Sequence, residues 1–310
     1  MSDTSTIRNY KGSRRKWSAT TRRRFSCFLF VLPALLVILV FFLFPMLRSL
    51  QYSLTDWDGI GKEAKWVGLE NFIWVVTESS FRQVFINTFY LIILYVPVLN
   101  VIALLLAIAV YNVGKVGNVY KSILFFPNVL SMTVVAFIWK IIYSYNGILN
   151  QLFRAFGLES LAQDWLGQAG TVLPAMSVSI IWFAIGYYLL IYLAGLYNVP
   201  VEIYESAEVE GVNPVQKLFR ITIPLIAPSI TINIILSTIG IITLFDLPFV
   251  LTRGGPGYMS ETIALRVYSY AFVTLQTSYA LAMAVILGIF AITITLIQLR
   301  FLRRREDVLL

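Results

Sequence analysis

Six long apolar stretches place the strongest constraint on how this chain can fold. They cover approximately residues 27–47, 86–111, 122–143, 171–196, 223–251 and 277–302. A helix of about 20 residues crosses a hydrocarbon core of about 30 Å, so each stretch is long enough to span a membrane. Inside a bilayer every backbone N–H and C=O group needs a partner within the protein, and a helix provides one. We therefore expect an all-α membrane protein with six transmembrane helices.

The composition supports a membrane protein over a soluble one. Hydrophobic residues make up 58% of the 310 residues, and charged residues only 13%. Soluble domains carry about 25% charged residues. The formal net charge of +8 is also typical of nucleic-acid binding, but the lysines and arginines lie beside the apolar stretches, where they fix membrane topology. We expect contact with lipid and not with nucleic acid.

The basic residues also predict the orientation of the chain. With six crossings and both termini on one side, 16 of the 24 lysines and arginines fall on that side. The positive-inside rule assigns that side to the cytoplasm. The expected layout is a basic tail over 1–26, a membrane domain over 27–302 that includes a cytoplasmic loop at 198–222, and a cytoplasmic tail over 303–310. The loops expected to face outward are 49–85, 144–170 and 252–276.

Several absences narrow the chemistry of the chain. The first apolar stretch follows a cluster of arginines, but it is too long for a signal peptide and lacks a small-residue cleavage site, so we expect a retained anchor. Cys27 is the one cysteine and there is no histidine, which excludes an internal disulfide and histidine-dependent metal or acid–base chemistry. No GxxxxGK[ST] loop occurs. We expect no metal, no bound cofactor and no catalytic site in this chain.

The loop at 198–222 has the pattern of two short helices joined by a glycine turn. Pro200 and Pro214 suit the first turn of a helix, and each follows a possible capping asparagine by one or two residues. Gly211 can adopt the left-handed conformation that ends the first helix. Pro224 then marks the entry into the next apolar run. A polar helix pair beneath a membrane domain is typical of a docking element.

Four carboxylates crowd the first of these helices, at Glu202, Glu205, Glu208 and Glu210. Three of them recur every third residue and so form an acidic ridge on a helix. The alternative is a solvated loop face, which is what most charge clusters are. We favour docking, because the glycine and the prolines surround the ridge.

This loop closely resembles the EAA loop of permease subunits from bacterial ABC importers. The matching residues are Glu205, Ala207, Gly211, Phe219, Ile221, Pro224, Leu225 and Pro228, and the conservative departures are Ser206, Glu210, Val212 and Ile223. The sequences at 245–248 and 251–257 are similar to those of maltose and glycerol-phosphate type permeases. The resemblance implies a non-catalytic permease of a sugar importer in the bacterial cytoplasmic membrane, working by alternating access.

The resemblance also implies partners and coupling residues. The partners would be a second, similar permease, an extracytoplasmic sugar-binding protein and a cytoplasmic ATPase dimer that uses ATP and Mg²⁺. The ATPase-coupling residues would be Glu205, Ser206, Ala207, Glu208, Glu210, Gly211 and Phe219.

A stripe of small and polar residues runs along the fifth apolar stretch. Ser229, Asn233, Ser237 and Gly240 follow one another at helical spacing. Such residues let membrane helices pack closely, and they also suit the lining of a substrate pathway. Both interpretations stay open.

Asp246 is the one acidic residue inside an apolar stretch. A carboxylate within a membrane is costly unless it is paired or hydrated, so it is a candidate for binding sugar hydroxyls. The alternatives are a brace between helices and an exposed helix end. Pro248 is expected to open the helix locally at this point.

Aromatic and amide side chains provide further pathway candidates. Trp182, Tyr187, Tyr188 and Tyr192 crowd the fourth stretch, and Asn87, Asn100 and Asn128 lie in the second and third. Aromatic faces stack on sugars and amides bond hydroxyls, although membrane packing also uses aromatic residues. Within this set, Tyr187, Tyr188 and Asn128 join Asp246, Asn233 and Ser237 as the proposed pathway.

The glycine-rich segment 252–258 is expected on the outer face. Taken alone it is a turn between two crossings. By resemblance to the maltose-type permeases, an outer loop containing Arg253, Gly254, Gly255 and Pro256 would contact the binding protein.

A secondary transporter driven by an ion gradient is the alternative from another class. Such carriers tend to have more charges within the membrane and often have repeated halves. A single intramembrane acid, the absence of histidine and the docking loop favour the importer. The sequence leaves open whether the cargo is an oligosaccharide, a monosaccharide or a polyol phosphate.

Overall fold

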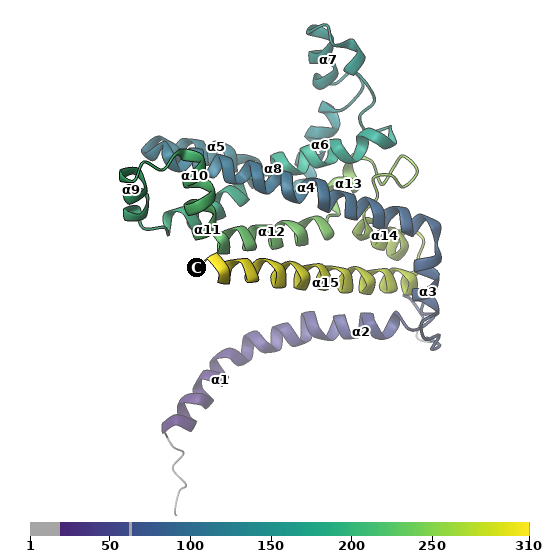
Figure 1. Cartoon of the computed structure of the whole chain (residues 1–310). Coiled ribbons are helices and arrows are strands. Elements are labelled where there is room, and N and C mark those ends of the chain that lie inside the picture. Colours follow the sequence, from purple (N-terminus) through teal and green to yellow (C-terminus); the bar gives the residue numbers. More distant parts are fainter. Residues whose placement is uncertain (1–18, 62–63, 310) are drawn as a thin grey trace, which may run out of the picture. The chain divides into compact units, whose positions relative to one another are not determined.

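The chain is almost entirely helical in its computed structural model, which describes residues 19–61 and 64–309 (Figure 1). Within those ranges the one β feature is an isolated antiparallel bridge between Thr55 and Trp66. Most of the tail predicted at 1–26 lies outside the described residues, as does residue 310. The all-α fold class predicted from the sequence is confirmed.

The chain divides into two units, Met1–Gln51 and Tyr52–Leu310. In the first, α1 (Ala19–Ile38) continues through a π-helical turn, η1 (Leu39–Leu43), into α2 (Phe44–Tyr52), which ends at the boundary. The apolar span covers Ser26–Tyr52, so it begins one residue before and ends five residues after the stretch predicted at 27–47. None of the residues in η1 and α2 is buried.

Four helices form the core of the second unit: α4 (Ser79–Asn112), α8 (Ala169–Tyr197), α12 (Ala227–Ile242) and α15 (Thr277–Leu309). Figure 1 shows them running alongside one another; α4 packs against α8 and α12, and α12 packs against α15. Their buried side chains are mainly aliphatic, with Leu91, Leu99, Met176, Leu189, Leu193 and Ile241 among the most enclosed.

Glycines on α8 allow two of its neighbours to approach closely. A Cβ atom at Gly186 would overlap the backbone of Leu124 and Phe125, and one at Gly195 would overlap the side chain of Ser229. Small residues at such contacts are how membrane helices gain packing area.

The third apolar stretch differs from the expectation of a single straight crossing over 122–143. It forms α5 (Gly117–Val129) and α6 (Met132–Ile142), which meet at 93°. Pro127 weakens the last turn of α5, and Leu130 and Ser131 have extended backbones. The Ser131 hydroxyl accepts a hydrogen bond from the N–H of Val134 at 3.3 Å and so begins α6. The described residues contain five helices able to cross a membrane, or six if this bent pair counts as one.

The fifth stretch is also interrupted, but before Pro248 and not at it. α12 ends at Ile242 and α13 (Asp246–Leu251) begins after a three-residue break. Proline has no N–H to donate to the carbonyl four residues earlier, which belongs to Leu244. The Thr262 hydroxyl donates to that carbonyl instead, at 2.7 Å. The opening that the sequence placed at Pro248 therefore lies at 243–245, and Pro248 is buried in the first turns of α13.

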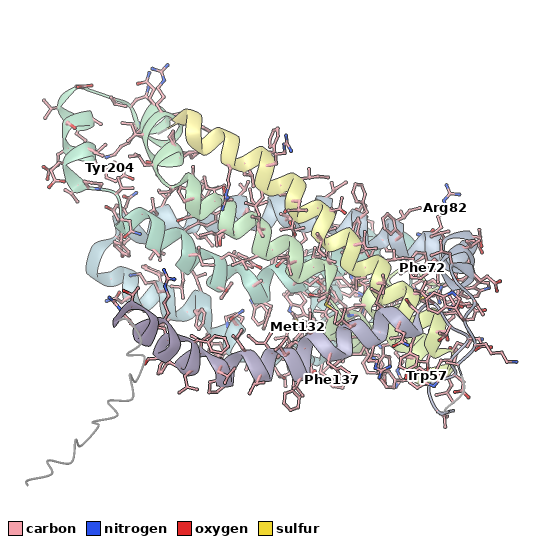
Figure 2. All side chains as sticks on the ribbon, turned by 90° about the horizontal axis from the view of Figure 1, so that it is seen from below. Trp57, Phe72, Arg82, Met132, Phe137 and Tyr204 are labelled. Carbon is pink, nitrogen blue, oxygen red and sulfur yellow. The ribbon has the colours of Figure 1, made fainter. Side chains whose placement is uncertain are left out.

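Short elements occupy the two ends of the second unit. One end carries α9 (Val201–Val209), α10 (Pro214–Lys217), η4 (Leu218–Thr222) and α11 (Ile223–Leu225). The remaining short elements are α3 (Glu70–Thr77), η2 (Gly114–Val116), α7 (Ile148–Ala155), η3 (Glu159–Leu161), α14 (Ile263–Tyr268) and η5 (Ser269–Val273). Figure 2 shows Tyr204 of α9 at one end, with Trp57, Phe72 and Arg82 at the other.

The glycine contacts of α8 generate a prediction for stability. Gly186→Ala should lower the stability of the protein by about 1–3 kcal/mol, because the added methyl group meets the backbone of α5 and not a movable side chain. The control is Gly288→Ala on α15, where no atom lies within 4 Å of the new Cβ. That change should be neutral or stabilising by up to about 1 kcal/mol, since alanine favours the helix. Thermal unfolding of the two purified variants checks this, and equal melting temperatures would contradict it.

Candidate functional site

The loop between α8 and α12 folds as two short helices. Gly211, at φ 72°, ends α9 in the left-handed conformation, and the N–H of Val212 closes the helix on the carbonyl of Ala207 at 3.0 Å. The side chain of Asn213 accepts a hydrogen bond from the N–H of Gln216 at 2.8 Å, and the Gln216 side-chain carbonyl accepts one from the N–H of Asn213 at 3.4 Å. This capping box starts α10. The predicted cap at Asn213 is therefore confirmed, whereas the one predicted at Asn198 is wrong: Asn198 ends α8, and α9 begins after Pro200 without a side-chain cap.

The exposed face of this pair is acidic and apolar. Glu202, Glu205, Glu208 and Glu210 are all exposed. Glu208 pairs with Lys217 at 2.7 Å, and this hydrogen bond, with the positive charge of Lys217, lowers the pKa of Glu208. The other three carboxylates have no ion-pair partner among the described residues. Of the four carboxylates, one is therefore neutralised by a lysine of the same loop, and the other three keep an exposed negative charge.

Large apolar side chains are also exposed on this pair and on η4, which follows it. Val209 is 90% exposed and Phe219 is 63% exposed, with Val215 between them in sequence at 65%. Of the predicted coupling residues, Ala207 is buried, and the Ser206 hydroxyl donates to the Glu202 carbonyl at 2.8 Å. Sequence reasoning missed Val209 and Val215. The sequence signal that could have identified them is that single valines interrupt the polar residues of this loop.

Tyrosine rings connect the helix pair to the ends of the long helices. Tyr204 of α9 lies 6.3 Å from Tyr111 near the end of α4, and Tyr111 lies 5.3 Å from Tyr197 at the end of α8, measured between ring centroids. Lys217 Nζ sits 5.0 Å from the Tyr204 ring, and Lys121 of α5 sits 5.0 Å from the Tyr197 ring. α4 and α10 therefore contact Tyr204 of α9 directly. The Tyr111–Tyr197 and Lys121–Tyr197 contacts extend this cluster to α8 and α5.

The two pathway candidates on α12 lie buried between helices. The amide of Asn233 donates to the Tyr188 carbonyl at 3.1 Å, and Ser237 donates to the Asn233 carbonyl at 2.7 Å. The amide of Asn100 on α4 reaches Ser237 at 3.0 Å. Two of these hydrogen bonds join α12 to α8 and to α4, as expected of residues that pack helices together. A role for Asn233 and Ser237 in the substrate pathway stays a prediction.

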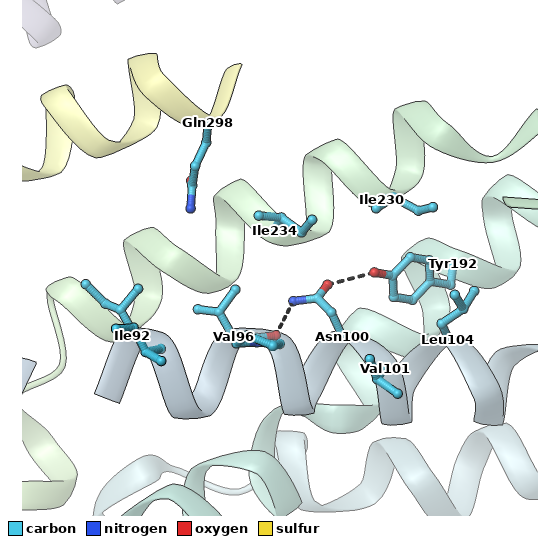
Figure 3. A pocket seen from close by; sticks show the side chains of 11 residues that line it. Ile92, Val96, Asn100, Val101, Leu104, Tyr192, Ile230, Ile234 and Gln298 are labelled. Carbon is cyan, nitrogen blue, oxygen red and sulfur yellow. Dashed lines mark hydrogen bonds between the residues drawn. The ribbon is translucent and has the colours of Figure 1, made fainter. Parts of the chain in front are cut away.

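A cavity of about 520 Å³ opens between α4, α8, α12 and α15 (Figure 3). Three polar side chains reach it, from Asn100, Tyr192 and Gln298, and the other lining residues are aliphatic or proline. Tyr192 donates to the Asn100 side-chain carbonyl at 2.7 Å, whereas the buried Oε1 atom of Gln298 has no hydrogen-bond partner among the described residues. None of the six predicted pathway residues lines this cavity.

The remaining pathway candidates are dispersed. Asp246 is exposed and begins α13, and Asn128 is half-buried beside the bend between α5 and α6. The rings of Tyr187 and Tyr188 meet edge to face at 5.2 Å, with Tyr188 buried and Tyr187 exposed. Within the described part of the chain, no hydrogen bond joins Asp246 or Asn128 to either tyrosine.

The segment 252–258 is held far more firmly than a simple turn. Arg253 and Tyr258 have positive φ values of 51° and 67°, which side chains other than glycine rarely adopt. The Ser260 hydroxyl bonds to Thr252 at 2.7 Å and to the Gly255 carbonyl at 2.6 Å. These bonds leave Arg253, Gly257 and Tyr258 exposed while Gly254 is buried.

A buried ion pair lies directly after this segment. Arg266 Nη1 is 3.3 Å from Glu261 Oε2, and each side chain is only 5% exposed. Burial raises the pKa of Glu261 to about 7; Arg266 opposes the rise, and Glu78 adds to it. The sequence predicted Arg266 only as one of the basic residues of an outer loop. Nothing in the spacing of Glu261 and Arg266 indicates that they are buried together.

Comparisons with known proteins agree on one family. The model of the family described as "Binding-protein-dependent transport system inner membrane component" matches residues 76–307. The chain is 31% identical to the probable ABC transporter permease protein YurN of Bacillus subtilis over 283 residues, which covers 90% of this chain and 97% of YurN. It is 30% identical over 277 residues to the multiple sugar-binding transport system permease protein MsmF of Streptococcus mutans, covering 89% and 95%.

A solved structure has the same fold. It is the bacterial alginate ABC transporter in complex with its alginate pentasaccharide-bound periplasmic protein, with a TM-score of 0.78 and 22% identity. The match covers 92% of this chain and 96% of the other.

The raised pKa of Glu261 generates a pH prediction. Its ordinary value is 4.5 and its folded value is about 7, so between these values the folded state binds more protons than the unfolded state. The free energy of unfolding should therefore fall as the pH rises from about 4.5 to about 7. The melting temperature of the wild-type protein should drop more between pH 5 and pH 8 than that of Glu261→Gln, which cannot ionise. Identical pH profiles for the two proteins would contradict the prediction.

Proposed function

Since the chain belongs to the family of binding-protein-dependent transport system inner membrane components, we propose that it is the permease subunit through which an ATP-driven importer moves a carbohydrate. It is a multi-pass membrane protein with five or six apolar helices long enough to cross a bilayer. The observation that carries the proposal is the family match over 76–307, together with an exposed helix pair inside that range.

The carbohydrate class rests on the relatives. MsmF is described as a permease of a multiple sugar-binding transport system, and the alginate transporter acts with a periplasmic protein that holds a pentasaccharide. We infer that this chain also receives its cargo from an extracytoplasmic sugar-binding protein. The segment with Arg253, Gly254, Gly255 and Pro256 is the proposed contact, because part of it is exposed on a rigidly held loop.

The exposed face of α9 and α10 is the proposed contact with a cytoplasmic ATPase dimer. Glu205, Glu210 and Phe219 extend outward from it, while Gly211 sets the angle between the helices. The ATPase would bind ATP and Mg²⁺ and hydrolyse the nucleotide, and this chain would contribute no catalytic group. The tyrosines at positions 111, 197 and 204 would carry the movement of α9 to the long helices.

The proposed topology counts the bent α5–α6 pair as one crossing, which gives six. Both termini and the loop 198–222 then lie in the cytoplasm of a bacterial cell, with a membrane domain over 27–302 between short tails at 1–26 and 303–310. A second, similar permease would complete the pathway. Alternating access would expose the pathway residues to each side in turn: Asp246, Asn233, Ser237, Tyr187, Tyr188 and Asn128.

Cysteine labelling tests this topology. In a Cys27→Ser background, a cysteine replacing Ser206 on α9 should react with a membrane-impermeant maleimide only after cells are permeabilised. A cysteine replacing Gln151 on α7 should react in intact cells, because 144–170 is expected to face outward. Both positions are exposed in the structure. Labelling of the Ser206 position in intact cells would overturn the orientation.

Coupling is tested by changes at Gly211 and Glu205. Gly211→Val should cost about 1–2 kcal/mol of backbone strain, since the residue has φ 72° but no atom within 4 Å of a new Cβ. Glu205→Lys reverses an exposed charge of the ridge. Both variants should insert into the membrane normally but lose ATPase attachment or transport-stimulated ATP hydrolysis, measured in purified complexes.

Conservative changes serve as the controls for coupling. Gly211→Asn should retain most of the coupling, because asparagine tolerates the left-handed conformation. Exposed residues of α7, such as Gln151, should tolerate alanine without effect on the ATPase. Normal attachment and normal hydrolysis in both Gly211→Val and Glu205→Lys would show that the loop only connects two crossings.

A further inference from the structure

We propose that Glu261 and Arg266 are positioning residues that hold the segment 252–258 in the form in which the sugar-binding protein meets it. This inference rests on the proposed function of that segment. Neither residue contacts the partner directly in this proposal, because both side chains are only 5% exposed. They would fix the conformation of the segment through their contacts with its backbone and its aromatic ring.

The pair is poorly explained as a source of stability. Glu261 Oε2 and the Nε and Nη2 atoms of Arg266 are buried and have no hydrogen-bond partner among the described residues. A buried ion pair repays its desolvation only when the remaining donors and acceptors are satisfied. Glu78 brings a second carboxylate to the same place, with one buried oxygen that is also unpartnered. A costly cluster of this kind is a candidate for a functional role.

Both members of the ion pair contact residues of the exposed segment. The Cβ and Cγ atoms of Glu261 lie 3.2 Å from the position of a Cβ at Gly254, so the glycine rests on the glutamate side chain. The Arg266 guanidinium lies 4.4 Å from the centroid of the Tyr258 ring and 5.6 Å from that of Tyr270. The two ends of the exposed segment are therefore supported by the two partners of one ion pair.

The segment needs such support because of its backbone. Arg253, Gly254, Gly257 and Tyr258 all have positive φ, at 51°, 87°, 51° and 67°. Non-glycine residues in this region are strained, and they persist only where surrounding contacts impose them. The strain falls on the residues proposed to meet the binding protein, so relaxation of the segment would change its binding surface.

The rest of the loop is anchored to the long helices. Asn87 on α4 donates to the carbonyls of Tyr258 at 2.7 Å and Glu261 at 3.1 Å, and Gln83 donates to Asn87 at 2.9 Å. Thr262 bonds to Leu244 in the break between α12 and α13. α14, which carries Arg266, packs against α4 (Figure 1). A contact made at 253–258 is therefore connected to the opening beside Asp246.

Binding measurements on the assembled complex test the proposal. The complex of this chain with its partner permease and ATPase is placed in lipid nanodiscs, and the probe is the purified extracytoplasmic binding protein of the same system. Arg266→Met and Glu261→Gln should each raise the Kd for the binding protein about two- to thirtyfold. The Kd of the double variant should be no higher than that of the weaker-binding single variant, because the two residues act as one unit.

Further measurements separate positioning from a general loss of structure. The yield of assembled complex, and its ATP hydrolysis without binding protein, should stay close to the wild-type values. The matched control is Arg48→Met, which removes another arginine stacked on an aromatic ring, 5.4 Å from Phe44, and should leave the Kd unchanged. Unchanged Kd in both pair variants, or losses of assembly that parallel the loss of binding, would overturn the proposal.

Arg253→Ala distinguishes this inference from the function on which it rests. Arg253 is exposed on the segment and belongs to the proposed contact. If Arg253→Ala raises the Kd while the pair variants do not, the contact stands and the positioning role is wrong. If none of the three changes alters the Kd, the segment does not meet the binding protein and both ideas fail.

Discussion

The need of every backbone polar group for a partner inside an apolar environment is the constraint on which this structure depends. It makes the long apolar stretches helical, and it also governs the places where they break. At Pro248 the helix loses a donor, and the Leu244 carbonyl finds one in the Thr262 hydroxyl at 2.7 Å. The break is therefore tied to a loop distant in sequence, and α13 and that loop are held together.

The interruptions of the apolar stretches lie beside residues that we propose for the substrate pathway. Asn128 lies half-buried beside the bend between α5 and α6, and the break before α13 leaves Asp246 exposed. Among the described residues, the loop after α13 and the helix pair before α11 are both exposed and held by hydrogen bonds. The helix pair connects α8 to the segment that leads into α12, and Asn87 of α4 bonds to the loop.

Polar groups inside the second unit have two kinds of surroundings. Asn100, Ser237 and Tyr192 bond to one another and close the contact of α4 with α8 and α12. Glu261 and Arg266 are paired but keep unsatisfied atoms in a buried place. The first arrangement stabilises packing, while the second is costly to maintain and is the stronger indication of function.

The sequence by itself determined the helical class, the long apolar spans and the short helix pair, because these follow from local hydrophobicity, glycine and capping residues. It also identified the family, through the spacing of Glu205, Gly211, Pro224 and Pro228. Only the tertiary structure decided that the third stretch turns by 93°, that Ala207 faces inward while Val209 is exposed, and that Asn233 and Ser237 lie between helices. The burial of Glu261 with Arg266 also depended on it. Those outcomes depend on which helices meet, and the long-range contacts that decide this are not encoded in the local periodicity of the chain.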